Sequence, residues 1–199
     1  MALESWLSRP RLHWLKPTYA VFLDLIRCCV RAIALPVLPP ETYIRYSRVL
    51  NFGPPKIVTY KLGPLPQLYA SMFGWPEMTE VVARAFNALP PEERARTTIF
   101  GSNYGEAEAI DLLGGKYGLP KAISGHQSYF LWGPRDYTGE SVLVIGSERE
   151  YLERYYASVE EVGKLYHPHS MPHEHYKLYH CRGLKWPMDQ VWPRLKNWN

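Results

Sequence analysis

Sequence patterns typical of helices and of strands alternate along the last two thirds of the chain, and this alternation constrains the fold more than any other feature. Residues 76–89 have helical periodicity, beginning with a proline and acidic residues and ending before a double proline. The β-branched and aromatic run 97–103 predicts a strand, and residues 104–117 predict a second helix that a glycine ends. The apolar run SVLVIG at 141–146 predicts a strand buried on both faces.

The same reading extends to the C-terminal part of the chain. KAIS at 121–124 predicts a short strand, and EREYLERYYAS at 148–158 predicts a helix. Two further strands are expected around VEEVGKLYH and YKLYHCRG. We therefore expect an α/β fold with an open, largely parallel or mixed sheet flanked by helices, in which the late strands can be antiparallel at one edge.

Composition excludes several classes of protein. With 46% hydrophobic and 21% charged residues, the chain can bury a core, which excludes wholesale disorder. The net charge of +4 is scattered along the chain and gives no support to nucleic-acid binding. Three cysteines, two of them adjacent, cannot form the paired framework of a small disulfide-rich domain.

The longest apolar run, residues 17–38, has the length of a membrane-spanning helix but contains three charges. Asp24, Arg27 and Arg31 would each cost about 2.5 to 3.5 kcal/mol near the centre of a span. Two interpretations stay open: a retained membrane anchor whose basic flank stays cytoplasmic, or a soluble amphipathic helix with the three charges on one stripe. Together with the basic stretch before it, this hydrophobic helix precedes the α/β fold.

Proline spacing divides the chain into three expected parts. Residues 1–38 hold the basic stretch and the degenerate transmembrane-like helix, and residues 39–64 form a proline-rich linker with a short helix. Residues 65–199 form the α/β domain.

Two turns that follow neighbouring strands supply the leading candidate for a binding site. In an open α/β sheet the loops at the carboxyl ends of the strands gather at one edge, where ligands usually bind. The first turn follows FGSN and the second follows AISG. The candidate ligand-binding residues are polar or aromatic, as in a site for a sugar or a polar headgroup: Asn103, Tyr104, Glu106, Ser124, His126, Gln127 and Trp132.

A structural explanation competes with this one, because Asn103 and Glu106 also fit a capping box at the start of the second helix. His126 near Glu106 could form an acid–base pair, but no nucleophile or orienting carboxylate accompanies it, so no catalytic residue is assigned. The chain lacks the GxGxxG, GxxxxGK[ST] and GxSxG motifs, and no cofactor is expected.

Five histidines crowd into HPHSMPHEHYKLYH at 167–180. Zinc, copper or nickel binding is one interpretation, with Glu174 as an oxygen ligand. Two prolines make the segment irregular and its spacing matches no closed zinc site, so a surface histidine-rich loop is the default and no metal ligand is assigned.

Several longer motifs resemble a known family. NYGEAEAI at 103–110, LPKAISGHQSYFLWGPRDYTGE at 119–140 and CRGLK at 181–185 are similar to the carboxyl-terminal extracytoplasmic domain of bacterial membrane glycosyltransferases of family 39, in the GT-C superfamily with protein O-mannosyltransferases and aminoarabinose transferases. LPVLPPETYIRY at 35–46 resembles the exit from their last transmembrane helix, and coverage runs from about residue 17 to the end. The charges within 17–38 and the density of histidines depart from the family pattern.

This resemblance implies a polyprenyl-phosphate-linked sugar as the donor, and a catalytic acid in a loop of a polytopic membrane region that this chain does not contain. The expected role is that of an appended, non-catalytic domain, or a truncated fragment, which is membrane-associated and periplasmic and aids recognition of donor or acceptor. The alternatives are a free-standing soluble module that binds a polar small molecule or metal, and an orphan remnant without activity.

Overall fold

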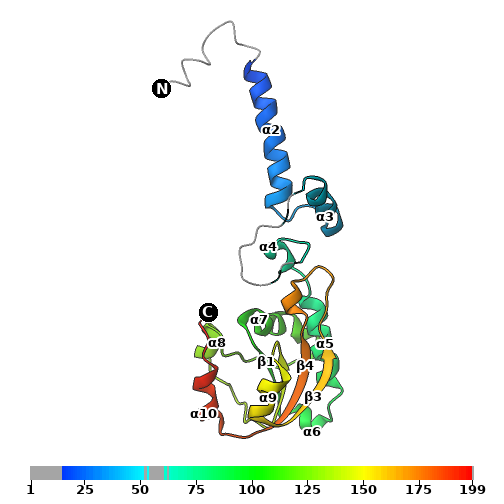
Figure 1. Cartoon of the computed structure of the whole chain (residues 1–199). Helices are drawn as coiled ribbons and strands as arrows, with labels where there is room; N and C mark the ends of the chain where they lie inside the picture. The colour runs from blue at the N-terminus through cyan, green and yellow to red at the C-terminus, as the bar shows by residue number, and fades with distance from the viewer. Residues whose placement is uncertain (1–14, 52, 54–60, 62, 199) are drawn as a thin grey trace.

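The computed structural model describes residues 15–51, 53, 61 and 63–198. At its centre is a four-stranded sheet with the order β1-β2-β4-β3 (Figure 1). The strands are β1 (Thr97–Gly101), β2 (Ser141–Ile145), β3 (Tyr156–Lys164) and β4 (Lys177–Leu184). β1 and β2 are parallel, whereas β4 is antiparallel to both of its neighbours. The sheet is therefore open and mixed, with the late strands antiparallel at one edge as expected.

The position of β2 inside the sheet explains why its sequence is apolar at consecutive positions. All five of its residues are buried, because successive side chains point to opposite faces and both faces are covered. Leu143 and Ile145 join one core cluster, and Val142 and Val144 join the other. The predicted strand 121–124 is reduced to one residue, Ile123, which forms a parallel bridge to Phe100 beside β1.

Helices α5 (Trp75–Asn87) and α7 (Tyr104–Leu113) pack on one face of the sheet through Val82, Phe86 and Ile110. Both helices are confirmed within two residues of their expected starts. After α7 the chain tightens into the 3₁₀ turn η2 (Gly114–Tyr117). Gly118 then takes φ 71°, a conformation that glycine adopts readily.

The second face carries shorter elements: α9 (Arg149–Tyr155), α10 (Met188–Val191) and η4 (Trp192–Leu195). The predicted end of α9 is wrong by three residues, because the strand β3 begins at Tyr156. Residues 156–158 pair with β4, with Tyr156 opposite Leu184, and this long-range pairing outweighs the local helical pattern. Two further short helices are α6 (Pro91–Arg94) and α8 (Ser128–Leu131).

A third apolar cluster joins the segment expected as a linker to the α/β part. Helix α3 (Pro40–Val49) buries Tyr43, which is 1% exposed, in a cluster with α4 (Gln67–Ala70) and Met171. Met171 comes from the connection between β3 and β4, which also contains η3 (Pro172–Glu174). Residues 40–49 thus pack as part of the folded body, whereas residues 54–60 lie outside the described residues.

Helix α2 (Leu15–Ala34) extends away from this body (Figure 1). The expected N-terminal helix is present, with Asp24, Arg27 and Arg31 at spacings of three and four along it. In the described part of the chain, no helix combines the length and the apolar character that crossing a membrane requires. The basic stretch 1–14 lies outside the described residues.

Candidate functional site

The two turns expected to share an edge do so. Ile123 donates its backbone N–H to the carbonyl of Ile99 at 2.9 Å, and the carbonyl of Ile123 accepts the N–H of Gly101 at 3.0 Å. These bonds place the turn after Ile123 beside the turn after β1. The N–H of Tyr104 then donates to Nδ1 of His126 at 3.3 Å, and the two rings lie 5.1 Å apart. The predicted proximity of the turns is therefore confirmed.

Three of the seven predicted site residues are buried, and their contacts are structural. Ser124 is fully buried, and its Oγ accepts the N–H of His126 at 3.2 Å. Because Nδ1 of His126 accepts a backbone N–H, the imidazole satisfies an N–H of the first turn of α7 that has no partner within the helix. Ser124 and His126 therefore hold the edge together, and they do not face solvent.

Glu106 forms the capping box that was the competing explanation. Its N–H donates to Oδ1 of Asn103 at 3.0 Å, and its carboxylate accepts from Nδ2 of Asn103 at 2.9 Å and from the N–H of Ser102 at 2.6 Å. A Cβ atom on Gly146 would lie 2.5 Å from the same carboxylate. Burial nevertheless raises the pKa of Glu106 to about 7, and the nearby carboxylate of Glu174 also raises it, against the N–H donors that favour ionisation.

The remaining predicted residues offer accessible groups. Tyr104 is 47% exposed and Trp132 is 58% exposed, with the Trp132 ring 4.6 Å from that of Tyr129. Asn103 and Gln127 are partly exposed. Gln127 has φ 48°, a conformation that costs energy for a residue with a Cβ, and its N–H donates to the carbonyl of Asn197 at 2.9 Å. A ligand at this edge would therefore meet the Tyr104 ring and amide groups, whereas the Trp132 ring packs on Tyr129, whose hydroxyl donates to Asp111 of α7.

A small pocket adjoins the edge on the side of the histidine-rich segment. Asn103 and Glu106 line it together with Trp75, His167 and Glu174. Its volume of about 30 Å³ has room for a few water molecules and not for a sugar ring. Ser124, His126, Gln127 and Trp132 are absent from its lining, so the seven predicted residues do not converge on one cavity.

The histidine-rich segment contacts α3 and the turn after α4. His167 stacks on Phe73 with ring centroids 5.3 Å apart, and Nε2 of His169 lies 3.0 Å from the carboxylate of Glu41 on α3. Nε2 of His175 lies 3.0 Å from the carbonyl of His167. Within the described ranges, no three His, Cys, Asp or Glu side chains converge as metal ligands. The sequence analysis missed this packing role. The apolar residue Met171 among the histidines is the feature that could have indicated it.

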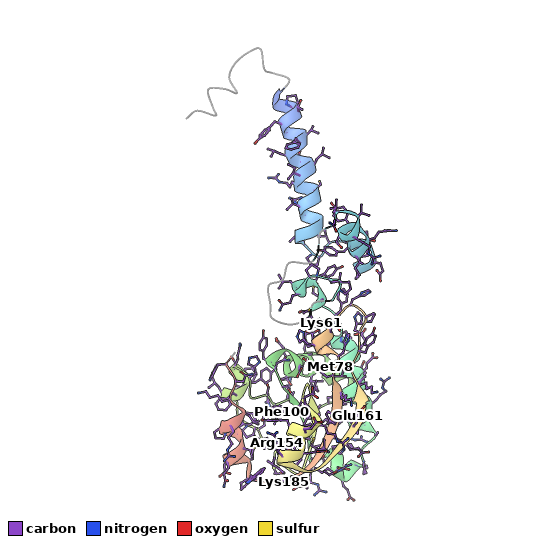
Figure 2. All side chains as sticks on the ribbon, in the orientation of Figure 1. Lys61, Met78, Phe100, Arg154, Glu161 and Lys185 are labelled. Atoms are coloured by element: carbon purple, nitrogen blue, oxygen red, sulfur yellow. The ribbon has the colours of Figure 1, made fainter. Side chains whose placement is uncertain are left out.

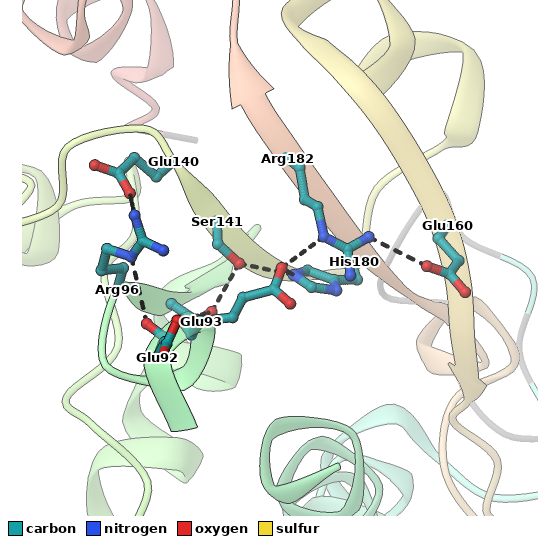
Figure 3. Close-up of polar contacts among 9 residues, drawn as sticks. Glu92, Glu93, Arg96, Glu140, Ser141, Glu160, His180 and Arg182 are labelled. Carbon is teal, nitrogen blue, oxygen red and sulfur yellow. Dashed lines mark hydrogen bonds and ion pairs between the residues drawn. The ribbon is translucent and has the colours of Figure 1, made fainter. Parts of the chain in front are cut away.

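A polar network between the strands was also missed (Figure 3). Oγ of Ser141 lies 2.7 Å from Nε2 of His180 and 2.7 Å from Oγ1 of Thr97, and Thr97 donates to the carbonyl of Glu93 at 2.8 Å. Because the single hydroxyl proton of Thr97 goes to that carbonyl, Ser141 must donate to Thr97. Nε2 of His180 must then carry a proton and donate to Ser141.

This order of donors shows whether the network can act as a catalytic triad. Oε1 of Glu93 lies 3.5 Å from the same Nε2 atom of His180. In a hydrolytic triad the serine and the carboxylate face different nitrogens of the histidine, so this arrangement is not a triad. Arg182 pairs with Glu93 at 2.6 Å and with Glu160 at 3.2 Å beside a groove of about 440 Å³ between α5 and β3. The network links α6 to all four strands, because Glu160 lies on β3.

No protein-family model, no curated protein and no solved structure matches this chain.

Proposed function

We propose that this chain is a non-catalytic recognition domain of a membrane glycosyltransferase that uses a polyprenyl-phosphate-linked sugar. The observation that carries the proposal is the direction in which the parallel strands β1 and β2 point. The carboxyl ends of β1 and β2 face the side from which α4, α3 and α2 extend (Figure 1). The candidate edge thus faces the side on which a membrane region joined through α2 would lie, and the chain would be held at the periplasmic face of the membrane.

In this proposal, exposed residues contact the ligand and buried residues hold those contacting residues in position. Tyr104 and Trp132 present exposed aromatic faces, on which a sugar ring or an isoprenoid unit can pack. Asn103 and Gln127 add amide groups that can pair with sugar hydroxyls. The buried residues hold these contacts in place, because His126 binds the N–H of Tyr104 and Glu106 binds the side chain of Asn103.

The test is a binding titration of the full chain with a polyprenyl-phosphate-linked hexose in detergent micelles, against empty micelles. Tyr104→Ala and Trp132→Ala should each weaken binding by about fivefold or more, because each loses about 1 kcal/mol of aromatic packing. Trp186→Ala is the matched control. Trp186 is 42% exposed and follows β4, which runs opposite to β2, so it lies at the other end of the sheet.

Equal losses from Trp132→Ala and Trp186→Ala, or no binding above that of empty micelles, would refute the proposal. Binding of free hexose as tight as that of the lipid-linked form would favour the alternative, a free-standing module for a polar small molecule.

A further inference from the structure

Helix α2 has one charged stripe and one broad apolar face. With about 100° per residue, Asp24, Arg27 and Arg31 fall within roughly 60° of the helix circumference. The apolar side chains occupy an arc of roughly 200° on the other side. Those that are described are each at least 43% exposed: Tyr19, Val21, Phe22, Leu23, Leu25, Ile26 and Val30. Figure 2 shows side chains standing out on both sides of α2, which extends away from the rest of the molecule.

The charged stripe determines how this helix can meet a lipid bilayer. In a spanning orientation, Asp24 and Arg27 would lie near the middle of the helix, inside the hydrocarbon, and Arg31 would lie in its last turn. In an orientation parallel to the surface, all three reach water or headgroups while the opposite face enters the acyl boundary. A large apolar face combined with low overall hydrophobicity is typical of such interfacial helices.

The charges also indicate the type of lipid. Arg27 and Arg31 are two cations against the single anion Asp24 on the exposed stripe, and Arg9, Arg11 and Lys16 precede it in the sequence. Basic residues beside an interfacial helix favour anionic headgroups. A second copy of the chain fits the helix less well, because the apolar arc is much wider than the narrow a/d seam of a coiled coil.

We propose that α2 lies in the plane of an anionic phospholipid surface, with its apolar face in the acyl boundary and Arg27 and Arg31 at the headgroups. This inference does not depend on the proposed recognition of a lipid-linked sugar, since it needs no residue of the α/β body. It identifies α2 as an interfacial anchor for the chain.

The test uses the full chain and vesicles that contain no polyprenyl lipid, either phosphatidylcholine or a mixture of phosphatidylcholine and phosphatidylglycerol. The wild-type chain should cosediment with the mixed vesicles and bind them at least about tenfold more tightly than the neutral ones, with the preference lost at high salt. Phe22→Glu should reduce binding by about tenfold or more, since it places a charge on the apolar face.

Ala20→Glu is the matched control, because Ala20 is an exposed residue of the same helix on the charged stripe. It adds the same charge and should reduce binding much less than Phe22→Glu. Equal losses in the two variants, or no binding to mixed vesicles, would overturn the proposal. So would oriented circular dichroism showing α2 perpendicular to the bilayer, or sedimentation without lipid showing a dimer that Phe22→Glu dissociates.

Discussion

Glu106 gives the fold a pH dependence that can be measured. Its pKa is about 7 in the folded chain, against an ordinary value of 4.5, because burial penalises the charged form. The folded state therefore binds the proton more tightly than the unfolded state. Stability from this group is fully present below pH 4.5 and is lost as the pH rises through about 7. The difference of about 2.5 between the two pKa values corresponds to roughly 3 kcal/mol.

The assay is denaturant unfolding of the wild type and of Glu106→Gln at several pH values from about 4.5 to about 8. Glutamine keeps the shape of the protonated acid but does not titrate. The free energy of unfolding of the wild type minus that of the variant should therefore fall by roughly 3 kcal/mol across this range. Titrating groups that do not interact with Glu106 contribute equally to both proteins and cancel in the difference.

A difference that stays constant with pH would show that folding leaves the pKa of Glu106 unchanged, and this would refute the reasoning. A second variant tests the cause of the shift. The carboxylate of Glu174 contributes to the raised pKa of Glu106, so in Glu174→Gln the fall should be smaller and centred at lower pH.

Three further predictions concern stability, each measured by denaturant unfolding. Gly146→Ala should destabilise the fold by more than Gly118→Ala, since both glycines have φ 71° but an added Cβ meets the Glu106 carboxylate at 2.5 Å in the first case and nothing within 4 Å in the second. Met171→Ala should cost about 2 to 5 kcal/mol and loosen α3, because the side chain is fully buried in the third cluster. Ser141→Ala should cost about 1 to 3 kcal/mol, since a buried imidazole N–H loses its acceptor.

Sequence patterns predicted the helices and strands that short-range periodicity or a short apolar run determines. The helix at 75–87 and the buried strand at 141–145 follow from periodicity and from uninterrupted apolar residues. The boundary at Tyr156 did not follow, because tyrosine suits both a helix and a strand, and pairing with Leu184 decides between them. Such a contact joins residues far apart in the sequence, where periodicity carries no information.

The candidate edge was partly predictable for the same reason. The capping box spans the three positions from Asn103 to Glu106, and the turn positions follow from the ends of strands. The sequence could not show that His126 would be buried, because its partner Tyr104 lies 22 residues earlier. Nor could it show that His180 meets Ser141, since these residues come from separate strands.

Photo-cross-linking tests the central claim most directly. A polyprenyl-phosphate-linked hexose that carries a diazirine on the sugar would be bound to the full chain, irradiated, and the adducts mapped by mass spectrometry. The proposed edge predicts adducts on Tyr104, Gln127 or Trp132, and competition by the unmodified lipid-linked hexose. Adducts around Trp186, or labelling that the unmodified compound does not reduce, would contradict a recognition surface at the carboxyl ends of β1 and β2.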